Sequence, residues 1–124
     1  MRLTASKILL SACSVAVITG TLLMTPFTTA GAEDKIAAEG KAIAFDRKLG
    51  NCLACHAIAG GDLAGNIAPP LIGMKQRFPD KAALRAQIWD PTVRNPNTIM
   101  PPFGRFNILT DKQIDEVVEF ISTL

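Results

Sequence analysis

Histidine and cysteine are scarce in this chain of 124 residues, which has one histidine and three cysteines. The histidine, His56, directly follows Cys55, and Cys52 lies three residues before Cys55, whereas Cys13 lies near the amino terminus. A structural zinc site needs four nitrogen or sulfur ligands, and the chain beyond its first 32 residues supplies only three such side chains. This shortage argues against a zinc site, and it leaves no second imidazole from which another histidine-based site could be built.

An excess of charge of one sign is also absent from most of the chain. The sequence has 13 lysines and arginines against 11 acidic residues, and the two extra positive charges are Arg2 and Lys7. Residues 33–124 therefore carry eleven basic and eleven acidic residues and are formally neutral. A nucleic acid is not expected as a partner, because no basic stripe is present to neutralise its phosphates.

The first 32 residues have the pattern of a secretory signal peptide. Arg2 and Lys7 precede a charge-free apolar run from Ile8 to Phe27, and Ala30-Gly31-Ala32 has the small residues of a cleavage site. We predict a cleaved signal peptide over residues 1–32, one mature domain over residues 33–124, and a periplasmic location. Two alternatives stay open. The apolar run is long enough to be kept as a membrane anchor, and residues 10–13, ending in Cys13, resemble a lipoprotein box behind a very short apolar stretch.

The stretch Cys52-Leu53-Ala54-Cys55-His56 is the C-x-x-C-H pattern that predicts covalent attachment of a c-type haem. If these residues form the first turn of a helix, both sulfurs lie on one face, where each can form a thioether to the same porphyrin. His56 is then placed to coordinate the iron. A thioredoxin-like redox pair would need a βαβ pattern nearby, whereas the flanks are helical in pattern. That redox pair and a structural disulfide are the alternatives.

The second axial ligand has to come from elsewhere in the chain. Without a second histidine, the candidates are methionine, lysine, the free amino terminus and water. We predict Met100, which lies in a proline-stiffened apolar loop over residues 91–106, and we assign Met74 to packing. Ligation by histidine and methionine raises the reduction potential and closes the iron to other ligands. This predicts outer-sphere electron transfer, with no small-molecule substrate on this chain.

Metal-bound histidines usually donate their other ring N–H to a carbonyl or carboxylate. The glycine- and proline-rich loop over residues 57–70 ends in Pro69-Pro70, a stiff segment that is our candidate for this carbonyl. Trp89, the only tryptophan, is a candidate for contact with the haem or for a hydrogen bond to a propionate. Ordinary core packing is the alternative for Trp89.

Three helices are predicted from caps and apolar spacing. The first covers residues 34–49 and ends at Gly50-Asn51. The second covers residues 81–89, after the N-cap Asp80, and buries Leu84 and Ile88.

The third predicted helix follows a capping box formed by Thr110 and Gln113. Its predicted apolar stripe consists of Ile114, Val117, Val118 and Ile121. Its acidic residues predicted to face solvent are Asp115, Glu116 and Glu119. Gly40, in the middle of the first helix, predicts a close crossing with this last helix.

Pro69-Pro70-Leu71-Ile72-Gly73 has the P-x-L-x-G form that follows the haem motif in the small class I cytochromes c, which this chain resembles. The resemblance implies that the carbonyl facing His56 is that of Pro69. It also implies an all-α fold with three to four helices and long loops around one covalently bound haem c.

Three stretches, residues 47–56, 65–71 and 95–104, also resemble the X subunit of the Sox sulfur-oxidation system. That resemblance implies a heterodimer in which an A subunit holds the active-site haem of an L-cysteine S-thiosulfotransferase-type complex. There thiosulfate is joined to a cysteine of a carrier protein, and electrons leave through the haem of the present chain to a downstream cytochrome. With Cys52 and Cys55 in thioethers and Cys13 removed, the mature chain has no free thiol for sulfur chemistry. The alternatives are a freely diffusing class I cytochrome c that serves an oxidase or reductase, and a thiol-disulfide oxidoreductase.

Overall fold

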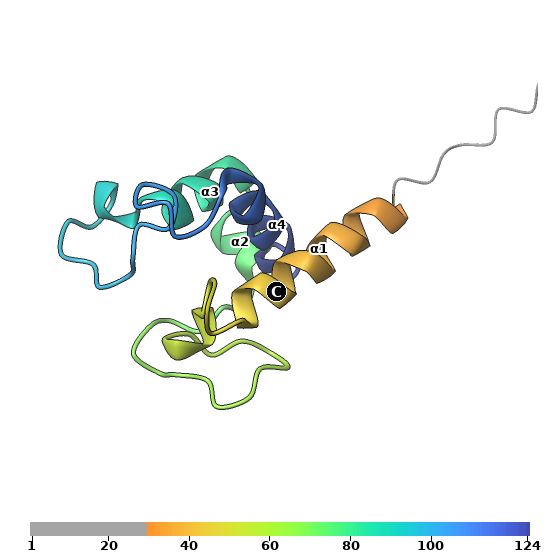
Figure 1. Cartoon of the computed structure of the whole chain (residues 1–124), viewed down its shortest axis with the longest axis horizontal. Coiled ribbons are helices and arrows are strands. Elements are labelled where there is room, and N and C mark those ends of the chain that lie inside the picture. Colours follow the sequence, from red (N-terminus) through yellow and green to blue (C-terminus); the bar gives the residue numbers. More distant parts are fainter. Residues whose placement is uncertain (1–29) are drawn as a thin grey trace, which may run out of the picture.

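The computed structural model describes residues 30–124, and the fold is helical (Figure 1). It contains four α-helices and two short 3-10 turns. In chain order these are α1 (Ala30–Phe45), η1 (Cys52–Ala54), α2 (Met74–Arg77), α3 (Lys81–Trp89), η2 (Pro91–Val93) and α4 (Asp111–Ile121). Residues 30–124 contain no β-strand, so the prediction of an all-α fold with three to four helices joined by long loops is confirmed.

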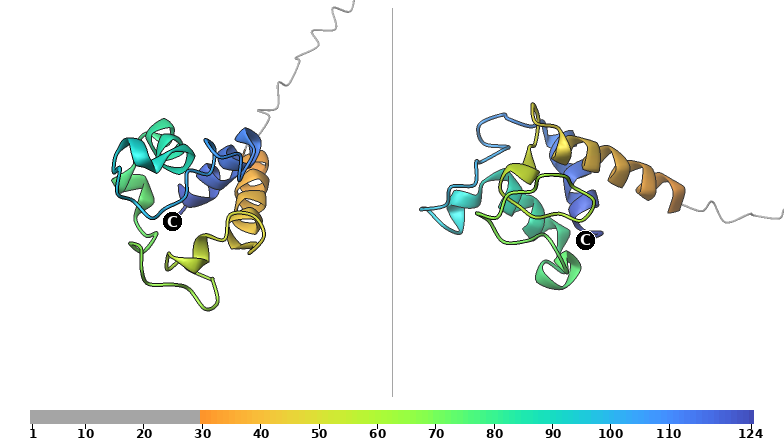
Figure 2. Two further views of the ribbon diagram at one scale, coloured as in Figure 1. Left: turned by 60° about the vertical axis from the view of Figure 1, so that its left-hand side comes forward. Right: turned by 90° about the horizontal axis from the view of Figure 1, so that it is seen from below.

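Helices α1 and α4 cross closely, and both views of Figure 2 show them side by side. A Cβ atom at Gly40 would overlap the carbonyl oxygen of Glu116, so the absence of a side chain at Gly40 permits this approach. The rings of Phe45 and Phe120 meet edge to face beside the crossing, with centroids 5.8 Å apart. The crossing predicted at Gly40 is confirmed.

Helix α4 begins with the predicted capping box. The backbone N–H of Gln113 donates to Thr110 Oγ1 at 3.2 Å, and the backbone N–H of Thr110 donates to Gln113 Oε1 at 2.9 Å. The buried residues of α4 include the whole predicted stripe together with Phe120. The prediction of a solvent-facing Glu116 is wrong: this residue is 7% exposed because it faces α1 at Gly40, and its carboxylate accepts from Lys112.

Helix α3 has the predicted bounds. The Asp80 carboxylate accepts from the backbone N–H of Ala82 at 2.8 Å, and Leu84 and Ile88 are buried. Arg85 projects from α3 toward α4, where it forms ion pairs with Asp111 at 2.9 Å and Asp115 at 2.6 Å. These pairs lie on the surface and join the two helices.

Helix α1 differs from its prediction at its end. It stops at Phe45, four residues before Leu49, and residues 47–50 form a turn. Two backbone hydrogen bonds close this turn, from Gly50 N–H to Ile43 O and from Asn51 N–H to Asp46 O, and Asn51 has a left-handed backbone with φ of 46°. The early end redirects the chain so that Cys52 starts a new turn.

The predicted signal peptide lies almost entirely outside the described residues, as do the apolar run and Cys13. Helix α1 begins at Ala30, so the last three residues of the predicted leader belong to its first turn. Within residues 30–124, none of the helices has the length and hydropathy that a membrane crossing requires.

Candidate functional site

A cavity of about 690 Å³ lies among the long loops and helices α3 and α4. This volume falls in the range of about 300–1,000 Å³ that is typical of ligand sites in proteins. The wall is mostly apolar and includes the side chains of Leu71, Ile88, Phe103, Leu109, Val117 and Ile121. Cys52, Cys55, His56, Pro69 and Met100 line the same cavity. The structure therefore brings together five of the six residues that the sequence singled out.

The C-x-x-C-H stretch forms the compact turn that the motif predicts. Residues 52–54 are a 3-10 turn, and the backbone N–H groups of Cys55 and His56 both donate to Cys52 O, at 3.2 and 2.9 Å. Both cysteines are half-buried, and neither is part of a disulfide within residues 30–124. Two sulfurs and one imidazole are thus presented to one apolar cavity from a single turn.

His56 is held from its far side by a proline carbonyl. Its Nδ1 lies 2.7 Å from Pro69 O, so the expected hydrogen bond is present. Backbone hydrogen bonds on both sides of the two prolines fix this segment to the motif, from Ala68 N–H to Cys55 O at 3.1 Å and from Leu71 N–H to Ala57 O at 2.9 Å. With Nδ1 bound to a carbonyl, the ring presents Nε2 as its free nitrogen for a metal.

Two thioethers line the cavity, and their surroundings differ. Met100 is half-buried in the second long loop, where its backbone N–H donates to Thr98 Oγ1 at 3.1 Å. Met74 is only 2% exposed, its backbone N–H donates to Leu124 O at 2.7 Å, and its Sδ accepts from Arg77 Nη1 at 3.3 Å. Met74 is therefore a fixed part of the core, in keeping with the packing role predicted for it.

The loop that carries Met100 starts from an anchored carboxylate. Asp90 accepts from the backbone and the hydroxyl of Thr92, at 3.1 and 2.5 Å, and forms an ion pair with Arg105 at 3.3 Å. The hydrogen bond from the Thr92 hydroxyl, helped by Arg105, keeps the pKa of Asp90 below its usual value. Asp90 thus stays ionised and joins the two ends of this loop.

Trp89 does not belong to the cavity wall. Its indole lies against Gly104, where a Cβ atom would overlap the ring, and its carbonyl oxygen accepts from the backbone N–H groups of Gly104 and Arg105. Trp89 is 38% exposed, so it is not a buried core residue, and its contact with the haem or with a propionate stays a prediction. The sequence could not separate this contact from core packing because tryptophan is common in both settings.

Burial affects the chemistry of the first cysteine. Loss of solvent contact raises the pKa of the Cys52 thiol to about 11, although a backbone hydrogen bond partly opposes this effect. Catalytic thiols need the opposite, because the thiolate is the nucleophile and its pKa is lowered in redox enzymes. The surroundings of Cys52 therefore disfavour the thiol-disulfide oxidoreductase alternative.

The comparison with protein families decides between the haem and the other interpretations of this site. Residues 37–124 match the family model described as cytochrome c. The chain belongs to the cytochrome c family. Membership implies covalently bound haem c and a role in electron transfer, and Cys52, Cys55 and His56 fit the attachment motif.

Two similar proteins indicate which kind of cytochrome c this chain is. A chain in the crystal structure of SoxXA from P. pantotrophus is 32% identical, with a TM-score of 0.64 and an alignment that covers 70% of this chain and 80% of that one. An uncharacterized lipoprotein of Aquifex aeolicus (strain VF5) is 33% identical over 78 residues, which are 60% of this chain. The match spans 36% of the length of that lipoprotein. The present chain is thus a class I monohaem cytochrome similar to SoxX.

The charges of the cavity wall were not predicted from the sequence of this cytochrome. Arg47 and Arg77 line the cavity, and no acidic side chain of the described residues does so. An apolar cavity with two guanidinium groups fits a flat apolar group with acidic substituents, which describes haem and its propionates. No local pattern marks either arginine: Arg47 lies in the turn after α1, Arg77 is the last residue of α2, and the fold brings both to the cavity.

Proposed function

We propose that this protein is a periplasmic electron-transfer subunit of a SoxXA-type, thiosulfate-oxidising cytochrome complex. The observation that carries the proposal is the convergence of Cys52, Cys55, His56 and Met100 on one apolar cavity. The 32% identity to a chain of the SoxXA structure supports the choice of complex.

The residues of the cavity have distinct roles in this proposal. Cys52 and Cys55 would hold the haem through thioethers, and His56 and Met100 would be the ligands of its iron. The haem supplies a one-electron couple. Pro69 O accepts from the ring of His56, which fixes the orientation of the imidazole and increases its basicity. The apolar wall excludes water, and a thioether ligand keeps the potential high.

The sulfur chemistry belongs to a partner in this proposal. Within residues 33–124 the only cysteines are Cys52 and Cys55, and both are used for the haem. An A subunit of the Sox type would bind thiosulfate and join it to the cysteine of a carrier protein, and the present chain would pass the released electrons to a downstream cytochrome. Removal of residues 1–32 as a signal peptide would place the mature chain in the periplasm.

The first experiment tests the haem and the leader together. The full chain is expressed through an export pathway with haem maturation, and its pyridine haemochrome spectrum and intact mass are measured. We expect a c-type spectrum and the mass of residues 33–124 plus one haem. A colourless protein with two titratable thiols would contradict the proposal.

The second experiment tests the complex. The cytochrome is co-expressed with the A subunit of the same organism and passed over a gel-filtration column. We expect co-elution in a 1:1 ratio, and reduction by thiosulfate plus carrier protein only in the complex. Separate elution, together with rapid electron exchange with an oxidase, would favour the freely diffusing carrier instead.

A further inference from the structure

Two consecutive proline carbonyls are each held by a different side chain. Pro69 O accepts from His56 Nδ1 at 2.7 Å, and Pro70 O accepts from Arg77 Nη1 at 2.8 Å. Neither proline has an N–H group of its own, so the dipeptide cannot fix itself by donating hydrogen bonds. The positions of its two carbonyls therefore depend on the groups that donate to them.

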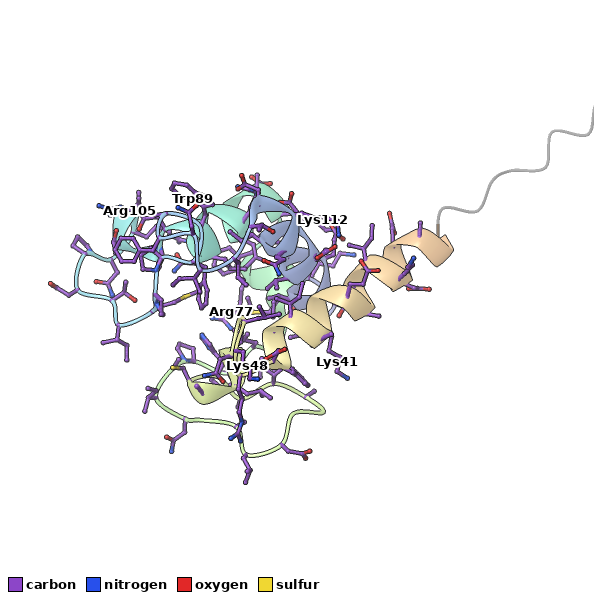
Figure 3. The ribbon with its side chains drawn as sticks, viewed as in Figure 1. Lys41, Lys48, Arg77, Trp89, Arg105 and Lys112 are labelled. Atoms are coloured by element: carbon purple, nitrogen blue, oxygen red, sulfur yellow. The ribbon has the colours of Figure 1, made fainter. Side chains whose placement is uncertain are left out.

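Arg77 is itself well anchored. The same Nη1 that donates to Pro70 O also donates to the buried sulfur of Met74, and the backbone N–H of Met74 donates to the carbonyl of Leu124 at the carboxyl end of the chain. Figure 3 shows Arg77 between the helices and the lower loop, which carries the C-x-x-C-H turn. The guanidinium thus links the helical core to the loop that faces His56.

We propose that Arg77 is a positioning residue for His56. By holding Pro70 O, Arg77 keeps the neighbouring Pro69 carbonyl aligned with Nδ1, and this alignment sets the orientation and basicity of the imidazole. The hydrogen bond from Arg77 is charge-assisted and therefore stronger than a neutral one. This inference rests on the proposed function, since it concerns His56 as an iron ligand.

Arg47 provides a control that is matched in charge. Both arginines line the cavity, but within residues 30–124 Pro70 O accepts from Arg77, and Arg47 donates to neither proline carbonyl. Removal of either arginine takes one positive charge from the cavity wall and changes the reduction potential for that reason alone. The reduction potential therefore cannot test the proposal. Only removal of Arg77 frees Pro70 O, so the hydrogen-exchange rate of the His56 Nδ1–H can test it.

The test measures hydrogen exchange of the His56 Nδ1–H by NMR in the oxidised holoprotein. Because the chain has one histidine, this proton is identified without ambiguity once the iron shifts its resonance. We expect exchange about tenfold faster in Arg77→Met, which corresponds to the loss of one charge-assisted hydrogen bond. We expect Arg47→Met to exchange at the wild-type rate. Wild-type exchange in Arg77→Met, or equal acceleration in both variants, would overturn the proposal.

A second variant covers the case in which Arg77→Met does not mature with haem. Arg77→Lys keeps the charge, but the lysine nitrogen is one bond closer to the backbone than Nη1 and therefore cannot occupy the position from which Nη1 donates to Pro70 O. We expect its exchange to be faster than in wild type, and an unchanged rate would contradict the role of Arg77. A wild-type protein without an iron-shifted His56 N–H would instead contradict the proposed function itself.

Discussion

At the scale of single residues, the choice between two thioethers is the sharpest question that the cavity raises. Met100 lies in a loop that bends into the cavity, whereas Met74 is fixed in the core by Leu124 and Arg77. We predict that Met100→Ala keeps its covalent haem but loses the sulfur-to-iron charge-transfer absorption of the oxidised protein. The open iron should then bind added imidazole, which the wild-type protein should exclude.

Met74→Leu is the matched control for this prediction. The exchange conserves volume, so it should cost less than about 1.5 kcal/mol of stability, and the charge-transfer absorption should persist. Persistence of the absorption in Met100→Ala, with its loss in Met74→Leu, would move the ligand role to Met74.

The pKa of Cys52 gives a pH-dependent prediction for the protein before haem is attached. Burial raises this pKa to about 11, so the thiol is protonated at neutral pH. In Cys55→Ala produced without haem maturation, alkylation of Cys52 by iodoacetamide should be slow at pH 7 and should accelerate about tenfold for each pH unit toward the pKa, since only the thiolate reacts. Denatured protein gives the reference rate. A fast, pH-independent reaction near pH 7 would restore the thiol-disulfide oxidoreductase alternative.

At the scale of the helices, the crossing of α1 and α4 depends on one glycine. Gly40→Ala should improve the intrinsic helix propensity of α1 by about 1 kcal/mol, but the new methyl group would overlap the carbonyl of Glu116. Overpacking of this kind costs about 1–3 kcal/mol, and a backbone carbonyl cannot move aside as a side chain does. We therefore predict a net loss of stability in chemical denaturation.

Ala38→Gly, on the exposed side of the same helix, provides the comparison. At position 38 only helix propensity changes, so the substitution should lower the free energy of unfolding by about 1 kcal/mol. If Gly40→Ala stabilised the protein by the same amount, the close crossing would not exist in solution.

The helices also show what could be predicted from the sequence. Helix α3 and the start of α4 were predicted correctly because their signals are local: Asp80 caps one helix, Pro91 follows its end, and Thr110 and Gln113 cap the other. The burial of Glu116 was missed because it results from the contact of α4 with α1, a distant part of the chain. The end of α1 was missed because Gly50-Asn51 ends the turn that follows the helix and not the helix itself.

The residues of the candidate site also differ in whether a local sequence signal marks them. The C-x-x-C-H turn is a contiguous motif, and the stiffness of Pro69-Pro70 pointed to the carbonyl beside His56. Arg77, the last residue of α2, is brought to the cavity by the fold and has no sequence signal. The same holds for the position of Trp89 against Gly104.

At the scale of the whole molecule, a formally neutral chain turns out to be electrically asymmetric. Segments 46–79 and 90–109, which hold the long loops and α2, carry six basic and three acidic residues and a formal charge of +3. The rest of residues 33–124, mostly helices α1, α3 and α4, carries five basic and eight acidic residues and a formal charge of −3. In Figure 3, Lys48, Arg77 and Arg105 mark the loop-bearing part, and Lys41 and Lys112 mark α1 and α4.

This asymmetry predicts how electron exchange depends on salt. The loops surround the cavity, and the two propionates of a haem bound there would lower the formal charge of this part from +3 to +1. An anionic reagent should still be attracted to this part, but weakly. Oxidation of the reduced protein by hexacyanoferrate should slow, by about twofold, as ionic strength rises from 10 to 150 mM, because the screening length falls from about 30 to about 8 Å. A cationic cobalt complex should show the reverse dependence in stopped-flow measurements.

Two charge reversals locate the effect on the surface. Lys48→Glu lies beside Arg47 in the loop-bearing part and should weaken the salt dependence, whereas Lys112→Glu lies on α4 and should leave it nearly unchanged. Both variants change the net charge by the same amount, so any difference between them reflects position alone. Equal effects of the two variants would mean that net charge governs the encounter.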